Sequence, residues 1–192
     1  MLVVYLARHG ETEWNAAGRI QGHTDTPLNE AGRDQARGIA EKLQKKNVGA
    51  VVASDLARAR ETAEIVARGL KLASPAVDTG LRERQLGAFE GLTRAELRER
   101  FPAEWDAYKR DHANTPPGGE PWEEFFERIS GCVRKLAARL AREDRRALIV
   151  THGGVLKALV IASLETPALV TVPNGALYRF SAEKTRLRLA PE

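Results

Sequence analysis

Two histidines and two arginines follow short apolar runs of this sequence: Arg8, His9, Arg58 and His152. The planar guanidinium of arginine matches the oxygens of a phosphate group, and two guanidinium groups neutralise a phosphate dianion. A neutral imidazole is a good nucleophile, and the glycine after each histidine leaves room for a substrate to approach. Each motif alone is compatible with a structural role. Their recurrence after three separate runs predicts a phosphate pocket that contains a nucleophilic histidine.

The apolar runs have the length and β-branched content of strands buried on both faces: Leu2–Ala7, Val48–Ala53 and Ala147–Thr151. Helical patterns alternate with them: Glu30–Lys46 after Asn29, a helix capped by Ser54 or Asp55 that continues through Gly69, Arg94–Arg100 after Thr93, a long helix from the loop at Thr115–Gly119 to Arg142, and an apolar helix that ends at Leu164. This alternation predicts a three-layer α/β/α fold around a mainly parallel sheet. Because ligands bind at the carboxyl ends of such strands, the three strand ends should meet at one site.

The remaining strand patterns predict how the sheet ends. Pro75–Val77 is a short candidate strand. The C-terminal part reads as Val170–Val172, a turn at Pro173–Gly175, and two further strands at Ala176–Ser181 and Arg186–Leu189. These segments are expected to form an antiparallel C-terminal edge. No repeat, low-complexity tract or linker divides the sequence, so residues 1–192 are expected to form a single domain.

Composition restricts the partners. The net charge of +4 and the pI near 9.4 are mild, and the basic residues are spread along helices, which argues against a nucleic-acid partner. No apolar run approaches the ~20 residues that cross a bilayer, and the first residues lack the basic start of a secretory signal. A single cysteine, Cys132, forms no internal disulfide, which favours a cytoplasmic protein. A small-molecule phosphomonoester is the expected partner, and the oligomeric state is not readable.

Several segments in order resemble the histidine phosphatase superfamily, in the branch that also contains cofactor-dependent phosphoglycerate mutases. The segments that carry the resemblance run from the first strand to the last histidine: Leu6–Asn15 (LARHGETEWN), Gly18–Gly22 (GRIQG), Asp25–Gly32 (DTPLNEAG), Ser54–Ala63 (SDLARARETA), Leu81–Gly91 (LRERQLGAFEG) and Val150–Gly154 (VTHGG). The resemblance covers the chain from Leu2 to about Asn174.

The resemblance implies a role for each matched position. His9 attacks phosphorus and becomes phosphohistidine, while Arg8, Arg58 and a protonated His152 bind the phosphoryl oxygens. Glu83 is the general acid that protonates the leaving oxygen and then the base that activates water. Asn15 hydrogen-bonds the phosphate. Further substrate-binding positions line the mouth: Gln21, Gly22 and Gly153. The resemblance implies neither a metal nor a cofactor.

A phosphatase is favoured over a mutase. The mutase branch carries an insertion with basic residues that hold the substrate carboxylate, and this chain is short between Gly91 and Val150. A compact mouth that admits water favours hydrolysis over return of the phosphoryl group to a bound product. Gly118–Pro121 resembles a Gly-Glu-Ser loop of the phosphatase branch, with Pro121 in place of the usual serine, and the effect of that change on specificity stays open.

Two other classes of protein remain as alternatives. A metal hydrolase is disfavoured because the four histidines show no His-x-His or His-Glu-x-x-His spacing. A module that binds a phosphorylated metabolite without catalysis is disfavoured because both His9 and Glu83 are present. Turnover of p-nitrophenyl phosphate with and without a chelator separates these classes.

Overall fold

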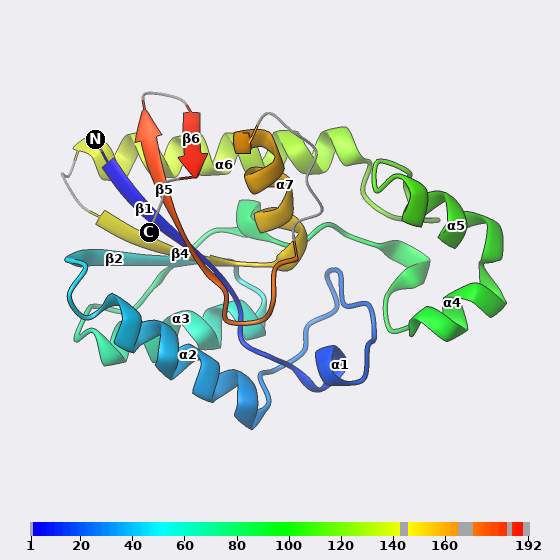
Figure 1. Ribbon diagram of the computed structural model, residues 1–192, viewed down its shortest axis with the longest axis horizontal. Helices are drawn as coiled ribbons and strands as arrows, with labels where there is room; N and C mark the ends of the chain where they lie inside the picture. The colour runs from blue at the N-terminus through cyan, green and yellow to red at the C-terminus, as the bar shows by residue number, and fades with distance from the viewer. Residues whose placement is uncertain (1, 143–145, 165–170, 184–185, 190–192) are drawn as a thin grey trace.

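The computed structural model describes residues 2–142, 146–164, 171–183 and 186–189. In these residues six strands form one sheet in the order β3-β2-β4-β1-β5-β6 (Figure 1). The strands are β1 (Leu2–Arg8), β2 (Val48–Ala53), β3 (Ala76–Val77), β4 (Arg146–Thr151), β5 (Leu177–Glu183) and β6 (Arg186–Leu189). The pairs β3-β2, β2-β4 and β4-β1 are parallel, whereas β1-β5 and β5-β6 are antiparallel. The predicted parallel sheet with an antiparallel C-terminal edge is confirmed.

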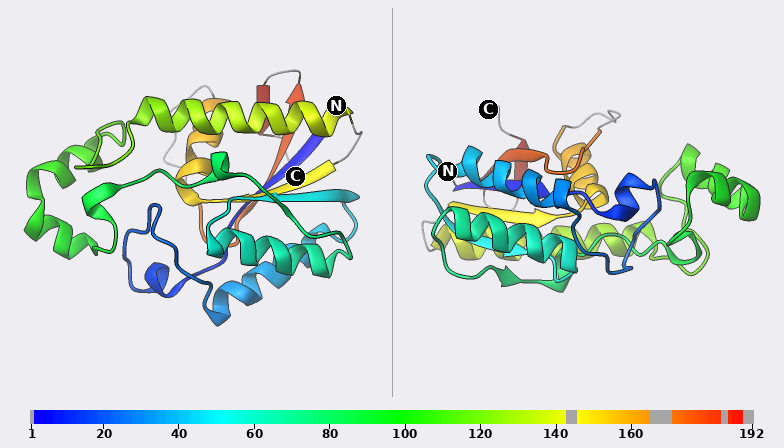
Figure 2. Two further views of the ribbon diagram at one scale, coloured as in Figure 1. Left: turned by 180° about the vertical axis from the view of Figure 1, so that it is seen from behind. Right: turned by 90° about the horizontal axis from the view of Figure 1, so that it is seen from below.

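Helices cover both faces of the sheet, as the two further views in Figure 2 show. The α-helices are α1 (Glu13–Ala16), α2 (Glu30–Leu43), α3 (Ala57–Gly69), α4 (Arg94–Arg100), α5 (Pro102–Arg110), α6 (Trp122–Arg142) and α7 (Gly153–Leu164), and two short 3-10 turns lie at Thr79–Leu81 and Gly87–Phe89. Helices α2 and α3 pack on one face of the sheet, and α6 and α7 pack on the other.

Alternation along β1 explains why its sequence is apolar throughout. Val4 and Leu6 pack in the core beneath α6 and α7, while Val3, Tyr5 and Ala7 pack in the core beneath α2 and α3. Successive side chains of a strand point to opposite faces, so a strand covered on both faces needs an apolar side chain at every position. The strand therefore becomes polar only where it leaves the core, at Arg8.

A smaller lobe lies to one side of the sheet, at the right of Figure 1, and contains α4 and α5. Its own core consists of Leu86, Phe89, Leu97 and Trp105. A capping box at Thr93, whose hydroxyl accepts from the Glu96 amide, starts α4 as predicted. Helix α5 was not predicted. The lobe matters for function because α4 forms the wall opposite the strand ends.

Three other expectations were wrong in detail. Helix α2 ends at Leu43 rather than Lys46. Neither Ser54 nor Asp55 caps α3, because the Asp25 carboxylate, from a distant loop, accepts from the Ala57 amide at 2.7 Å.

The third concerns the expected strand Val170–Val172. Val170 lies outside the described residues, and the next two residues form no strand. The Val172 carbonyl instead accepts a hydrogen bond from Arg8. Within the described part of the chain, no helix is long and apolar enough to cross a membrane.

Candidate active site

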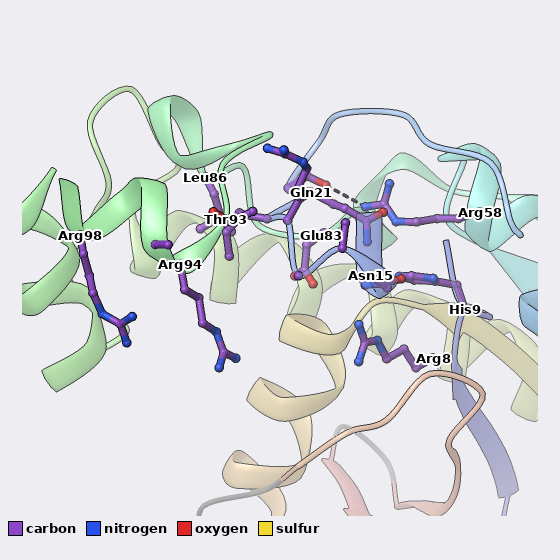
Figure 3. Close-up of a pocket in the computed structure, with 16 residues that line it drawn as sticks. Arg8, His9, Asn15, Gln21, Arg58, Glu83, Leu86, Thr93, Arg94 and Arg98 are labelled. Carbon is purple, nitrogen blue, oxygen red and sulfur yellow. Dashed lines mark hydrogen bonds between the residues drawn. The ribbon is translucent and has the colours of Figure 1, made fainter. Parts of the chain in front are cut away.

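A cavity of about 750 Å³ opens between the carboxyl ends of β1 and β2 and helix α4 (Figure 3). Seven of the predicted site residues line it: Arg8, His9, Asn15, Gln21, Gly22, Arg58 and Glu83. His152 is fully buried behind His9, with ring centroids 5.2 Å apart and an interplanar angle of 58°. Gly153 was predicted to line the mouth of this cavity, but it does not. It packs against the Arg8 side chain and faces a second cavity. Residues far apart in sequence are thus brought together at one rim of the sheet.

The end of β1 fixes the orientation of His9. The His9 amide donates to the Thr151 carbonyl at 2.9 Å, so the backbone is still held by β4. The ring nitrogen Nδ1 lies 2.6 Å from the Gly10 carbonyl oxygen. A carbonyl only accepts hydrogen bonds, so Nδ1 carries the proton and Nε2 keeps its lone pair. His9 is therefore held in the tautomer whose Nε2 is a nucleophile.

A threonine that was not singled out in the sequence holds the peptide after His9. The Gly10 amide donates to the Thr62 hydroxyl at 3.0 Å, and this hydroxyl donates to the Arg58 carbonyl at 2.7 Å. A side chain at Gly10 is excluded because its Cβ would lie 2.2 Å from the Gly32 carbonyl oxygen. Thr62 and Gly10 together fix the carbonyl that sets the His9 tautomer.

Arg58 is 1 % exposed, although it is an arginine on a helix. Its two terminal nitrogens donate to the carbonyls of Thr24 and Gly22 at 2.9 and 2.8 Å. Burial lowers the pKa of Arg58 to about 10, so the guanidinium stays charged at neutral pH. The loop that it binds is held by the Glu90 carboxylate, which accepts from the amides of His23 and Thr24.

Both histidines are poised as neutral imidazoles. Burial lowers the pKa of His9 well below 6.5, and the nearby Arg58 and Arg8 charges lower it further. Burial and then Arg58 lower the pKa of His152 in the same way. The protonated His152 expected from the sequence belongs to the site with a phosphoryl group bound, and it stays a prediction. An arriving phosphate brings the negative charge that the protonated form requires.

Buried nitrogens without hydrogen-bond partners gather around His9. The described residues contain five buried side-chain polar atoms without a partner, and four of them belong to Arg8, Arg58 and His152. They are Nε of each arginine and both ring nitrogens of His152. Leaving a buried donor unpaired costs about 1–3 kcal/mol, and more when the group is charged. The site is therefore organised to receive an anion with several acceptor oxygens.

Two amide side chains are oriented by their neighbours. The Oδ1 atom of Asn15 accepts from the Thr12 amide at 3.2 Å and from Nδ2 of Asn174 at 3.1 Å. The Oε1 atom of Gln21 accepts from the Thr26 hydroxyl at 2.6 Å. Because the oxygens are engaged, the NH₂ groups of Asn15 and Gln21 remain as donors for a ligand in the cavity that both residues line.

Glu83 is held at the start of α7. Its two carboxylate oxygens accept from the amides of Arg84 at 2.9 Å and Gly154 at 2.8 Å. A Cβ at Gly154 would lie 2.3 Å from the carboxylate, so a side chain there would displace Glu83 from this position. The carboxylate faces the cavity from the side of the smaller lobe (Figure 3).

The backbone of Glu83 is clamped by side chains from other segments. Its carbonyl accepts from Nη2 of Arg128 at 3.1 Å and from Nε2 of His23 at 2.7 Å. Arg128 in turn forms two hydrogen bonds of 2.8 Å with the Glu120 carboxylate. Glu120 is the glutamate of the loop in which Pro121 replaces the usual serine. This loop therefore helps to hold the Glu83 backbone through Glu120 and Arg128. Glu120 is kept in the loop, and the Pro121 change leaves this contact in place.

Helix α4 adds positive charge at the mouth of the cavity. Arg94 and Arg98 project toward it from successive turns (Figure 3) and have no ion-pair partner among the described residues. Arg19 also lines the mouth but is paired with Glu96 at 3.0 Å. This rim attracts anions to the cavity. In the described ranges, no three or more His, Cys, Asp and Glu side chains are grouped as metal ligands.

Sequence reasoning missed three groups that support the site: Thr62, Asn174 and the Arg128–Glu120 pair. Besides Asn15, Nδ2 of Asn174 donates to the carbonyls of His9 at 3.2 Å and Gly10 at 3.3 Å. The sequence showed only the turn chemistry of Pro173–Gly175, and no local pattern indicates that this turn folds back onto β1. The matched segment Ser54–Ala63 contained Thr62 but did not reveal its role.

Comparisons with known proteins agree with the fold. The sequence model of the histidine phosphatase superfamily (branch 1) matches residues 4–190. Over 159 residues the chain is 38% identical to phosphoglycerate mutase-like protein 4 of Arabidopsis thaliana, covering 81% of this chain and 68% of that protein. It is also 38% identical to the metal-independent phosphoserine phosphatase of the same plant over 177 residues, 91% of this chain and 74% of that protein.

A solved structure is similar over nearly its whole length. The mycobacterial glucosyl-3-phosphoglycerate phosphatase in complex with VO3 superposes with a TM-score of 0.88 at 36% identity, covering 99% of this chain and 98% of that one. The buried histidine among arginines thus lies on an α/β/α fold that such phosphatases share. The chain belongs to the histidine phosphatase superfamily, branch 1.

Proposed function

We propose that the protein is a phosphatase that hydrolyses small phosphomonoesters through a phosphohistidine formed on His9. The observation that carries the proposal is the set of four buried, unpartnered nitrogens around a neutral His9 whose Nε2 is available. A phosphate dianion supplies acceptor oxygens to the two arginine nitrogens and to a donor nitrogen of His152. Relatives named as phosphatases support the same conclusion.

In the first step, the Nε2 lone pair of His9 attacks phosphorus and the bond from phosphorus to the leaving oxygen breaks. The three remaining oxygens are bound by Arg8, Arg58 and the Asn15 amide, with His152 taking up charge as the phosphate arrives. The Gln21 side chain and the Gly22 backbone contact the substrate at the mouth of the cavity. Glu83 must carry a proton at this stage, and it transfers that proton to the leaving oxygen.

In the second step, water enters the place of the departed alcohol. The Glu83 carboxylate takes a proton from this water as the oxygen attacks phosphorus. The bond between phosphorus and Nε2 breaks, and His9 regains its lone pair as phosphate leaves. Gly153 contributes indirectly, because a Cβ there would lie 3.3 Å from Nε of Arg8 and would crowd this side chain.

The short segment between Gly91 and β4 supports hydrolysis over the mutase reaction. In the described residues this segment forms α4, α5 and α6, and its cavity-lining cations are Arg94 and Arg98 on α4. A cavity open at this rim admits water after the alcohol has left. An assay for interconversion of phosphoglycerates tests the mutase alternative directly.

Turnover of p-nitrophenyl phosphate with and without EDTA tests the proposal. Equal rates are expected because Arg8, Arg58 and His152 supply the positive charge, and vanadate should inhibit as a mimic of five-coordinate phosphorus. Loss of turnover on chelation, restored by Zn²⁺ or Mg²⁺, would favour the metal-hydrolase alternative.

We also propose that residues 1–192 act as one domain, and that the single cysteine reflects a cytoplasmic location.

A further inference from the structure

A second cavity, of about 550 Å³, lies on the other side of Glu83 between α5, the start of α6 and α7. Glu83 and Leu86 line both cavities, so the second one adjoins the phosphate site at these two residues. Apolar and aromatic side chains form most of its inner wall: Leu86, Tyr108, Trp122, Phe125 and Ile161. The rim of the first cavity is cationic, whereas this wall suits a planar apolar group.

The aromatic wall is built from stacked and fixed groups. Tyr108 stacks on His112 with ring centroids 4.7 Å apart and an interplanar angle of 28°. The Arg84 guanidinium lies 5.6 Å from the centroid of the Trp122 ring. Arg84 is 3 % exposed and donates to the carbonyls of Glu120 and His112, which ties this wall to the acid segment. The cavity is therefore preformed.

We propose that this second cavity holds the leaving group of the substrate, and that it selects aryl and arylalkyl phosphomonoesters. The inference rests on the proposed function, in which Glu83 protonates the leaving oxygen. That oxygen must lie beside Glu83, which lines both cavities, and the apolar wall of the second cavity offers a place for the atoms attached to it. An aromatic ring in this space is removed from water against Tyr108, Trp122 and Ile161.

Tyr108 adds a polar contact within the cavity. Burial, together with the nearby Glu83 carboxylate, raises the pKa of Tyr108 to about 12. The phenol therefore stays protonated and is a hydrogen-bond donor next to the acid. Nζ of Lys157, which also lines the cavity, lies 3.5 Å from Nε2 of His112.

The test compares benzyl phosphate with ethyl phosphate, whose alcohols have similar acidity. For the unmodified protein, kcat/KM should be ~10- to 100-fold higher for benzyl phosphate, the range that burial of a phenyl ring gives. Ile161→Trp fills the cavity and should remove this preference, because the phenyl ring loses its place against the apolar wall. Ala162→Trp, at an exposed neighbouring position of α7, is the matched control and should keep the preference.

A binding measurement separates this inference from catalysis. Benzylphosphonate, which is not hydrolysed, should inhibit p-nitrophenyl phosphate turnover ~10-fold more strongly than methylphosphonate, and Ile161→Trp should equalise the two. Equal turnover of benzyl and ethyl phosphate, or a preference that survives Ile161→Trp, would overturn the leaving-group pocket alone. Failure to hydrolyse any phosphomonoester would overturn the proposed function and this inference with it.

Discussion

Replacing Arg128 by methionine should weaken both the fold and the acid step, although Arg128 does not line the catalytic cavity. Its guanidinium donates to the carbonyls of Gly80, Arg82 and Glu83 at 3.0–3.1 Å. It also forms two hydrogen bonds of 2.8 Å with the Glu120 carboxylate. Methionine keeps the apolar stem and removes all five of these bonds.

The size of the effect follows from the exposure of the ion pair. Breaking a buried pair by removing one partner costs about 3–5 kcal/mol. The side chains of Arg128 and Glu120 are 24% and 14% exposed, so water solvates part of the orphaned carboxylate. We therefore expect Arg128→Met to lower the free energy of unfolding by about 2–3 kcal/mol. Adding Glu120→Gln should recover part of this loss, because it removes the unpaired charge.

The kinetic effect should depend on the leaving group. A shift of about 1 Å in a catalytic group costs on the order of 10²-fold in rate. If the clamp positions Glu83, Arg128→Met should slow alkyl phosphate turnover ~10²-fold and slow formation of the phosphoenzyme from p-nitrophenyl phosphate much less, since p-nitrophenolate leaves without a proton. Urea unfolding and single-turnover kinetics on both substrates measure the two effects.

Arg134→Met is the matched control, because Arg134 is an exposed arginine of the same helix. This control should leave stability and both rates close to those of the unmodified protein. Equal losses of phosphorylation rate on the two substrates would refute the positioning role of Arg128. A stability of Arg128→Met equal to that of Arg134→Met would refute the energetic argument.

Three further predictions concern the site itself. Glu83→Gln should slow His9 phosphorylation by alkyl phosphates ~10²-fold or more and by p-nitrophenyl phosphate much less; an equal fall would mean that Glu83 only shapes the cavity. Thr62→Val keeps the shape but leaves the buried Gly10 amide unpaired, so urea unfolding should show a loss of about 1–3 kcal/mol, and an unchanged midpoint would contradict this. Burial holds the pKa values of His9 and His152 below 6.5 in the folded state only, so below that pH the unfolded chain binds more protons. The free energy of unfolding should therefore fall by up to ~2.7 kcal/mol per pH unit as the pH drops below about 6.5, and a flat profile would refute the burial argument.

The sequence predicted the position of a site residue where that residue directly follows a clearly apolar strand pattern. Runs such as Leu2–Ala7 are apolar at every position, which fixed their burial on both faces and hence the rim where His9 lies. The family resemblance supplied the identity of the general acid, because Glu83 does not directly follow a strand. The 3-10 turn at Thr79–Leu81 lies between it and β3. The strand pattern and the family resemblance are therefore two separate signals, and together they predicted the fold and the family.

What the sequence did not reveal are contacts between distant backbone groups. The Val172 carbonyl is used by Arg8, and the Ala57 amide by Asp25, so the expected strand and the expected helix cap were both wrong. Such bonds join segments 164 and 32 residues apart and depend on tertiary packing rather than local propensity. The lowered pKa of His152 was not predicted for a related reason. Its complete burial is a property of the assembled site.

The central claim is that phosphate is transferred to Nε2 of His9, and trapping the phosphoenzyme tests it most directly. Excess protein should be mixed with a phosphomonoester, quenched in alkali, and analysed by mass spectrometry and ³¹P NMR. Because Nδ1 is held by the Gly10 carbonyl at 2.6 Å, we expect one phosphate on Nε2 of His9, formed as fast as turnover, and none in His9→Ala. Phosphate on Nδ1 or on another residue, or full turnover by His9→Ala, would contradict it.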